Sequence, residues 1–199
     1  MNIIKKIYPN ISEDKLKELK YDEEGLYSIT LPDEAKIISL LLVRSLKKKA
    51  KKSTIFDGTA GLGGNTLSFC NYFKNVISCE INKSRYDILK KNIELYKYNN
   101  VISNNINCIE YIKNNNSSDV YFFDPPWGGP DYKFKTNISL KLSGMSLINI
   151  IKLIKNKNNN AIICFKLPFN YNFNEFENIK YYKKKIKNII ILLIYSIIK

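Results

Sequence analysis

The feature that most constrains the fold is an alternation of short apolar segments with helical segments that begins near residue 53. The pattern predicts strands at 53–57, 75–81, 101–107, 119–123 and 161–168, and helices at 65–73, 83–98 and 146–156. Two last segments, "YYKKKIK" and "NIIILLIYSII", predict a closing antiparallel hairpin. Strands that alternate with helices form a parallel sheet whose two faces are both covered. The sequence therefore predicts an α/β fold.

The first 50 residues differ from the rest, because their pattern is helical throughout. Pro32 can open a helix, with Thr30 or Leu31 near its cap, and "AKIISLLLVRSLKKK" then gives an apolar face and a lysine-rich end. We divide the chain into a helical extension at 1–50, which packs over the active site, and a single globular core at 51–199.

The charge of the chain points to a polyanionic partner. It has 199 residues, and 32 basic residues against 18 acidic ones give a net charge of +14. RNA or DNA is the obvious partner for such a surface. Lys, Asn, Ile and Tyr also crowd the sequence, as an AT-rich genome would produce. Composition alone does not show whether the excess of lysine serves nucleic-acid binding or reflects the base composition of the genome.

The absence of histidine removes several kinds of chemistry. With no His in the sequence, His general bases, Ser-His-Asp or Cys-His systems and His metal sites are excluded. The cysteines are Cys70, Cys79, Cys108 and Cys164, none in CxxC spacing. We expect reduced core cysteines, no metal, and an intracellular location. The most apolar run, 189–198, is about half of the roughly 20 residues that a membrane helix needs, so we expect no membrane contact.

Half of the glycines gather in one loop. Of eight glycines, four fall in the seven residues 58–64, within "DGTAGLGGNT" between the first strand and its helix. Glycines there let backbone N–H groups approach a ligand at a helix N-terminus. The loop is not a Walker A, since no GK[ST] follows, and Thr66 stands where G-x-G-x-x-G has its third glycine.

Acidic residues end the first two predicted strands. Asp57 suits a cationic group such as an amino-acid ammonium, and Glu80 can accept both hydroxyls of a ribose. Ammonium, ribose and a close backbone approach together describe S-adenosylmethionine. A tight turn with two solvated acids is the alternative interpretation of the same residues.

A second motif follows the fourth predicted strand. Asp124-Pro125-Pro126-Trp127 has the form [DNS]-P-P-[YFW]. The first side chain and a proline carbonyl can accept both hydrogens of an aromatic amine, which aims its lone pair, while the prolines stiffen the loop and the aromatic ring stacks on the base. This is typical of amino-methyltransferases; a proline-rich turn with a packing tryptophan is the alternative.

The extended motif "DPPWGGPDY" resembles the trimethylguanosine synthases, which methylate the N2 amine of the 7-methylguanosine RNA cap. Three further segments agree in order and spacing: "DEEGLYSIT", "DGTAGLGGNTLSF" and "NVISCEINKSRYDILKKN". The similarity runs from about Lys20 to the C-terminus and is weak after Asp131. It implies a Rossmann-like, seven-stranded class I methyltransferase.

The resemblance also implies which residues form the site. Ser28 and Thr30 would close over the cofactor, Asn107 would lie near its adenine amine, and Trp127 would stack on the cap base. The full expected cofactor set is Ser28, Thr30, Asp57, Gly58, Thr59, Ala60, Gly61, Asn65, Thr66, Glu80, Ile81, Asn107 and Asp124. The expected catalytic residues are Asp124, Pro125, Pro126 and Trp127, and those expected to bind substrate are Trp127, Lys166 and Asn170.

The sequence departs from the family at three places. The family usually has Ser where Asp124 stands. In the family a proline directly follows the entry Thr, whereas here Leu31 lies between Thr30 and Pro32. The family also has an Arg that holds cap phosphates, and here Phe169, followed by Asn170, replaces it. Lys166 could substitute as a point charge. The number of methyl groups added and the way in which the cap phosphates are bound are therefore left open.

We predict transfer of methyl from S-adenosylmethionine to the cap N2 amine, by a monomer whose partner is capped RNA and whose location is nuclear or cytoplasmic. One alternative is an amino-methyltransferase acting on adenine N6 or internal guanine N2 of RNA or DNA, which Asp124 favours. Another is a catalytically silent RNA-binding subunit, although Asp57 and Glu80, which such a subunit would lose, are both present.

Overall fold

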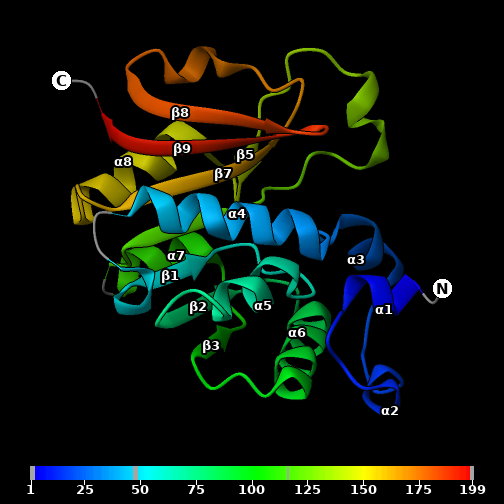
Figure 1. The fold of residues 1–199 in the computed structure, drawn as a ribbon. Helices are drawn as coiled ribbons and strands as arrows, with labels where there is room; N and C mark the ends of the chain where they lie inside the picture. Colours follow the sequence, from blue (N-terminus) through cyan, green and yellow to red (C-terminus); the bar gives the residue numbers. More distant parts are fainter. Residues whose placement is uncertain (1–2, 47–48, 116, 198–199) are drawn as a thin grey trace.

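A single seven-stranded sheet forms the centre of the molecule (Figure 1). The computed structural model describes residues 3–46, 49–115 and 117–197. The order of the strands is β3-β2-β1-β4-β7-β9-β8. They are β1 (Thr54–Asp57), β2 (Asn75–Cys79), β3 (Val101–Asn104), β4 (Val120–Phe123), β7 (Ile162–Pro168), β8 (Ile179–Ile186) and β9 (Ile189–Ile197).

Five of the strands run parallel, and the closing hairpin reverses direction. β3, β2, β1, β4 and β7 pair in parallel, whereas β9 pairs antiparallel with both β7 and β8. The carboxyl ends of the parallel strands therefore meet at one edge of the sheet, which is where open α/β sheets bind ligands. The predicted α/β class and the closing hairpin are confirmed.

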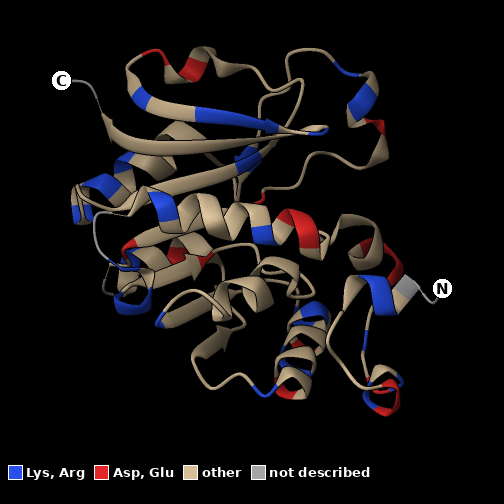
Figure 2. Cartoon of the chain, in the orientation of Figure 1, with Lys and Arg blue, Asp and Glu red and all other residues tan. Residues whose placement is uncertain are grey.

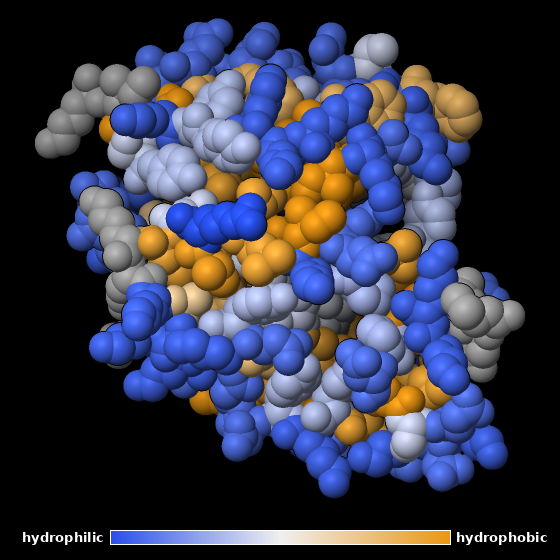
Figure 3. Space-filling model, in the orientation of Figure 1, coloured by the Kyte–Doolittle hydropathy of each residue, from blue (hydrophilic) through white to orange (hydrophobic). Residues whose placement is uncertain are grey.

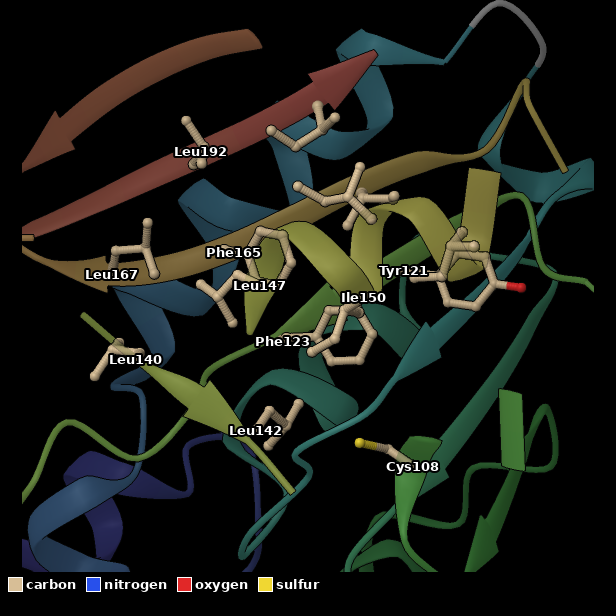
Figure 4. Close-up of a cluster of buried hydrophobic side chains, with 14 of the residues drawn as sticks. Cys108, Tyr121, Phe123, Leu140, Leu142, Leu147, Ile150, Phe165, Leu167 and Leu192 are labelled. Carbon is tan, nitrogen blue, oxygen red and sulfur yellow. The ribbon is translucent and has the colours of Figure 1, made fainter. Parts of the chain in front are cut away.

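Helices cover both faces of the sheet. On one face, α4 (Pro32–Ser45) and α5 (Gly64–Cys70) share a buried cluster with Phe122 and Ile191; on the other, α7 (Cys108–Asn114) and α8 (Leu147–Lys157) pack against Phe123 and Phe165. Figure 4 shows Leu147 and Ile150 of α8 beside Phe123 and Phe165 of the sheet. Because β4 is buried on both faces, its four residues are all apolar. The four cysteines are free and buried, as predicted.

The N-terminal segment lies against the glycine loop and α6 (Lys83–Tyr96). It contains α1 (Ile3–Ile7), α2 (Glu13–Leu16) and α3 (Glu23–Ser28). Buried Asn92 of α6 donates to the hydroxyl of Tyr8 and to the carbonyls of Lys20 and Leu62, so three backbone or side-chain oxygens converge on one amide. Arg85 of α6 forms ion pairs with Asp22 and Glu24, on either side of the start of α3. These contacts attach the segment to α6. Its division from the core at residue 50 stays a prediction.

Some predicted boundaries were wrong. The third strand ends at Asn104 rather than at residue 107, because Asn105 donates its side-chain amide to the carbonyl of Glu80 and Asn107 caps helix α7. The sequence analysis missed α7, which is only seven residues long. The helix that opens at Pro32 was predicted to continue to residue 49, but α4 ends at Ser45. Residues 47 and 48 of that predicted helix and residue 198 of the predicted hairpin lie outside the described residues.

Three short elements complete the connection between β4 and α8. They are the 3-10 helix η2 (Pro130–Phe134) and the small hairpin of β5 (Lys141–Leu142) and β6 (Met145–Ser146). Between them, Ile138 forms an isolated parallel bridge with Tyr171, which follows β7. The long connection therefore returns across the end of β7, and it brings residues 135–141 to the carboxyl edge of the sheet.

The surface is strongly hydrophilic around a small apolar area. In Figure 3, hydrophobic side chains gather in the middle of the face that carries α4, and hydrophilic side chains surround them, including along the upper rim where β8 lies. Ile37 of α4 is one such exposed apolar residue.

Candidate active site

Parallel pairing of β1 with β4 brings two acidic residues to the same edge of the sheet. Asp57 is the last residue of β1 and pairs in register with Phe122, and Asp124 directly follows β4. Thr59 joins them: its hydroxyl accepts from the backbone N–H of Asp124 at 2.7 Å, and its own N–H donates to Oδ1 of Asp57 at 3.3 Å. The two motifs found in the sequence are therefore parts of one site.

The Asp57 carboxylate is fully buried and organises the loop that follows it. Its Oδ2 accepts from the hydroxyl of Thr66 at 2.6 Å. Burial raises the pKa of Asp57 to about 7, and the hydrogen bonds from Thr66 and Thr59 oppose that rise. The expectation that Asp57 meets an ammonium group directly stays a prediction; in this structure its hydrogen bonds go to the loop and to α5.

Glycine is required where the loop meets α5. Gly63 caps that helix with a φ of 100°, a left-handed conformation that side chains rarely adopt. At Gly64 a Cβ atom would lie 2.6 Å from the backbone carbonyl oxygen of Thr30. The N-terminal segment therefore touches the glycine loop backbone to backbone, which only glycine permits.

Glu80 follows β2 and closes the other side of the loop. Its Oε2 accepts from the N–H of Gly61 at 2.9 Å, and its Oε1 accepts from the N–H of Asn82 at 2.8 Å. Each carboxylate oxygen can accept more than one hydrogen bond, so both retain capacity for the hydroxyls of a ribose. Asn107 is the N-cap of α7, where its Oδ1 accepts from the N–H of Ile109, and its expected place near the adenine amine stays a prediction. The exposed Ile81 lies next to Glu80.

Thr30 and Asn65 form the contact between the N-terminal segment and α5. Both are buried, and Nδ2 of Asn65 donates to the Thr30 hydroxyl at 2.8 Å. Oδ1 of Asn65 is also buried, but it has no hydrogen-bond partner among the described residues. A buried acceptor of this kind suits an ammonium donor, so the residues present fit an amino-acid-bearing cofactor. Ser28 is exposed, and its hydroxyl donates to the carbonyl of Glu24.

The Pro125-Pro126-Trp127 loop borders a cavity of about 620 Å³. Trp127 and Pro126 line it on one side, and Lys135, Lys141 and Glu175 contribute from the long connection and from η3 (Phe173–Phe176). The indole is half-buried and packs edge-on against Tyr132, with ring centroids 4.9 Å apart. Its Nε1 is buried and has no partner among residues 3–46, 49–115 and 117–197. This arrangement offers a flat ring beside a space that can hold a planar base.

Lys166 places a buried positive charge next to these groups. It lies on β7, and its Nζ binds Oδ2 of Asp124 at 2.6 Å and stands 5.2 Å from the centroid of the Trp127 ring. Burial raises the pKa of Asp124, and the contact with Lys166 opposes the rise. The sequence analysis expected Lys166 to reach a phosphate, whereas here its ammonium is directed at Asp124.

Asn170, expected to bind substrate, supports the acceptor loop in this structure. Its Nδ2 donates to the carbonyls of Tyr132 and Lys135. The sequence analysis overlooked Tyr132, Lys135 and Lys141, although Tyr132 stands inside the quoted motif "DPPWGGPDY". Lys135 and Lys141 carry no recognisable signal in the sequence, because only the return of the chain across β7 brings them to Trp127.

Comparison with known proteins identifies relatives of this chain. A family model described as RNA cap guanine-N2 methyltransferase matches residues 52–194. An uncharacterized protein of Acanthamoeba polyphaga mimivirus is 35% identical over 191 residues, covering 85% of this chain and 75% of that protein. A trimethylguanosine synthase of Schizosaccharomyces pombe is 30% identical over 127 residues, covering 60% of this chain and 50% of that protein.

Solved structures share the fold. A 16S rRNA N2 methyltransferase of T. thermophilus, in complex with AdoMet and guanosine, has a TM-score of 0.64 at 14% identity, covering 89% of this chain and 44% of that one. A putative methyltransferase of Escherichia coli has a TM-score of 0.59 at 16% identity, covering 86% of this chain and 90% of that one. The predicted Rossmann-like class I methyltransferase sheet is confirmed.

No helix in the described part of the chain is long and apolar enough to cross a membrane. Within the same residues, no cluster of three or more Cys, Asp or Glu side chains could hold a metal ion.

Burial of Asp57 predicts a pH dependence of stability. Its folded-state pKa of about 7 lies above the unfolded value near 3.8, so the folded protein retains a proton in that window and loses stability as the pH rises through it. The unfolding free energy of wild type should fall relative to Asp57→Asn between these pH values, by up to about 1.4 kcal/mol per pH unit. Urea denaturation at several pH values measures this.

A second variant gives that experiment its control. Thr66→Val removes the hydroxyl that opposes the effect of burial on Asp57. The loss of stability should then continue to higher pH than in wild type. A difference between wild type and Asp57→Asn that is the same at pH 4 and pH 8 would contradict the assignment.

The position of Glu80 predicts a role in cofactor affinity. Glu80→Gln keeps the shape but removes the charge, and the loss of a charge-assisted hydrogen bond costs about 1.5–3 kcal/mol, or roughly 10- to 150-fold in affinity for S-adenosylmethionine. Isothermal titration calorimetry measures it. Glu94→Gln, an exposed position on α6, is the matched control and should bind as wild type does. Unchanged affinity in Glu80→Gln would remove Glu80 from the cofactor site.

Proposed function

The chain belongs to the RNA cap guanine-N2 methyltransferase family, and we propose that its methyl acceptor is the exocyclic N2 amine of a 7-methylguanosine RNA cap. It is an S-adenosylmethionine-dependent methyltransferase. The observation that carries the proposal is the Asp124-Pro125-Pro126-Trp127 loop, which stands next to the Asp57 strand end and borders a cavity wide enough for a base.

The residues around Asp57 and Glu80 would hold the cofactor. Glu80 would bind the ribose, and the amide oxygen of Asn65, which has no partner among the described residues, would accept from the ammonium group. The backbone of the loop at Gly58–Gly61 would lie directly against the cofactor. Thr30 would close the site from the N-terminal segment. When bound, S-adenosylmethionine supplies an electrophilic methyl carbon on a positively charged sulfur.

The acceptor loop would orient the amine. An aromatic amine has two N–H donors, and the Asp124 carboxylate and the Pro125 carbonyl are two acceptors on one stiff segment. With both hydrogens held, the nitrogen lone pair points away from them, toward the cofactor side. Alignment of this kind is worth roughly 7–11 kcal/mol of the barrier. A chain without histidine can therefore perform the reaction, because the proton can pass to solvent after transfer.

Trp127 favours a cationic base. N7 methylation gives guanine a positive charge, and tryptophan is the best aromatic face for a cation, worth about 2 kcal/mol when desolvated. Neutral guanine or adenine would gain dispersion but not the charge attraction. A 7-methylguanosine cap therefore gains more binding free energy from the Trp127 ring than an internal nucleotide does.

One observation favours a second candidate. Asp124 stands where the trimethylguanosine synthases usually have serine, and an acidic first residue also suits enzymes that methylate adenine N6 or internal guanine N2. The two candidates share the cofactor site and the amine-orienting loop. They differ in the base that is methylated, which is cationic in a 7-methylguanosine cap and neutral in adenine or internal guanine.

Substitution of Trp127 separates the two candidates. Trp127→Phe should lower methyl transfer moderately and reduce the preference for 7-methylguanosine over guanosine caps, because a weaker face remains. Trp127→Ala should nearly abolish transfer. Transfer of labelled methyl to capped RNA, followed by nucleoside analysis, measures both.

The control is cofactor binding, which should barely change in either Trp127 variant. Uncapped RNA and an unmethylated guanosine cap are the reference substrates. Equal methylation of these and of the 7-methylguanosine cap by wild type would establish the second candidate in place of the first.

A basic strand next to the site would bind the RNA body. The edge strand β8 exposes Lys180, Lys183, Lys184 and Lys185 together with Tyr182, and Figure 2 shows this run of basic residues along the strand. Nζ of Lys183 stands 4.8 Å from the ring centroid of Phe173 in η3, the same 3-10 helix that contributes Glu175 to the Trp127 cavity. Interleaved lysines and tyrosines suit the backbone and bases of a single strand.

Replacing three of these lysines should change the salt dependence of RNA binding. Affinity for single strands falls with salt by a log–log slope of about 0.7 for each phosphate contact. Lys183, Lys184 and Lys185, all changed to Gln, should lower the slope for a capped oligonucleotide by about 2. Fluorescence anisotropy over a range of NaCl concentrations measures it.

The matched control changes Lys74, Lys90 and Lys97 to Gln, three exposed positions toward the β2 and α6 side of the molecule. It carries the same change in net charge and should keep the wild-type slope. Equal slopes in both triple variants would mean that the lysines of β8 only protect a sheet edge from pairing with other chains.

A further inference from the structure

Lys166 is a buried lysine in the middle of an apolar strand. Its neighbours Phe165 and Leu167 on β7 are fully buried, and Lys166 itself is only 6% exposed. Burying an ammonium group is costly unless charged and polar partners surround it. The structure supplies such partners, and all of them belong to the proposed active site.

Three groups surround the Lys166 ammonium. Nζ binds Oδ2 of Asp124 at 2.6 Å, donates to the hydroxyl of Thr30 at 3.1 Å, and lies over the Trp127 ring. These groups come from the end of β4, the N-terminal segment and the acceptor loop. One charge therefore contacts three separate parts of the chain that belong to the proposed active site.

The hydrogen bonds of the Thr30 hydroxyl also affect Asp124. Its oxygen accepts from Lys166 and from Nδ2 of Asn65, which leaves its own hydrogen to donate. Asp124 is the acceptor in reach, and the hydrogen bond from Thr30 works in the same direction as Lys166, toward the ionised carboxylate. The contacts with Lys166 and Thr30 therefore oppose the rise in the pKa of Asp124 that burial and the nearby Glu34 carboxylate cause.

We propose that Lys166 is a positioning residue that acts through Asp124: it binds Oδ2 of the carboxylate, keeps the group ionised, and turns the other oxygen, Oδ1, toward the acceptor amine. This role rests on the proposed function. It differs from a phosphate contact, because Lys166 is buried on β7 and its ammonium already binds Asp124 and Thr30 inside the protein.

A double-mutant cycle tests whether Lys166 acts through Asp124. The variants are Lys166→Met, Asp124→Asn and the two combined, with kcat measured on a 7-methylguanosine-capped RNA at saturating S-adenosylmethionine. Lys166→Met alone should lower kcat by about 10- to 100-fold, because it leaves a buried carboxylate without its partner. In the Asp124→Asn background the same change should cost less than about 3-fold, since an amide needs no counter-charge.

The pH profile gives a readout that a merely structural lysine would not move. Without Lys166 the buried carboxylate takes up a proton more easily, so the acidic limb of kcat should move to higher pH in Lys166→Met. Lys155→Met is the matched control, since Lys155 is the other buried lysine among the described residues and its Nζ binds the carbonyls of Asn159, Ala161 and Tyr195, away from Asp124. Its pH limb should stay at the wild-type value.

Protein stability tests the pairing without any substrate. Lys166→Met should lower the urea midpoint more at pH 8 than at pH 5, because protonation at low pH relieves the unpaired Asp124. Asp124→Asn should abolish that difference. An equal loss at both pH values would overturn the coupling.

The outcomes for the two proposals are distinct. Losses of kcat that simply multiply in the double variant, in an enzyme that methylates capped RNA, would overturn the role of Lys166 alone. A wild type that binds S-adenosylmethionine but transfers no methyl to the cap would overturn the proposed function. The urea measurements on the Lys166 and Asp124 variants would still show whether these two residues are coupled.

Discussion

Parallel pairing between β1 and β4 is the constraint on which the whole site depends. Two adjacent parallel strands end at the same edge, so Asp57 and Asp124 meet there although 67 positions separate them in the chain. The Thr59 hydroxyl then bridges the two strand ends, since it accepts from the N–H of Asp124 while its own N–H reaches Asp57. The cofactor loop and the acceptor loop are therefore joined directly through Thr59.

Electrostatics at this edge are set by two buried carboxylates in different surroundings. Asp57 is buried and has no basic partner among the described residues, and burial raises its pKa to about 7. Asp124 has Lys166 against it. A cationic cofactor and a cationic base would both relieve negative charge at this edge, which gives a single physical reason for two features of the proposed reaction.

The N-terminal segment contributes more than a cover. Its Thr30 backbone rests on Gly64, and its Thr30 hydroxyl joins Asn65 of α5 to Lys166 of β7. Arg85 and Asn92 of α6 attach the segment at a second place. Loss of the segment would therefore remove groups from the site itself, and a core beginning at residue 51 would lack the Thr30 contact to Lys166.

Much of the fold could be predicted from the sequence, because local signals are strong where burial is complete. The alternating strands and helices, the terminal hairpin, the glycine loop and the Asp-Pro-Pro-Trp motif are all visible as patterns of neighbouring residues. They predicted the sheet, the family and the chemical class. Short elements with weak periodicity, such as α7 and the hairpin of β5 and β6, were missed since two turns or two residues leave no periodic signal.

What the sequence by itself determined is the kind of site; what the tertiary structure decided is which side chains meet in it. From the sequence, Lys166 was predicted to replace the family's phosphate-binding Arg as a point charge, and only the register of β7 against β4 showed that it faces Asp124. Lys135 and Lys141 reach Trp127 because the chain returns across the end of β7. Pairings across 42 or 136 positions depend on strand order and side-chain direction, and neither is encoded in any short stretch of residues.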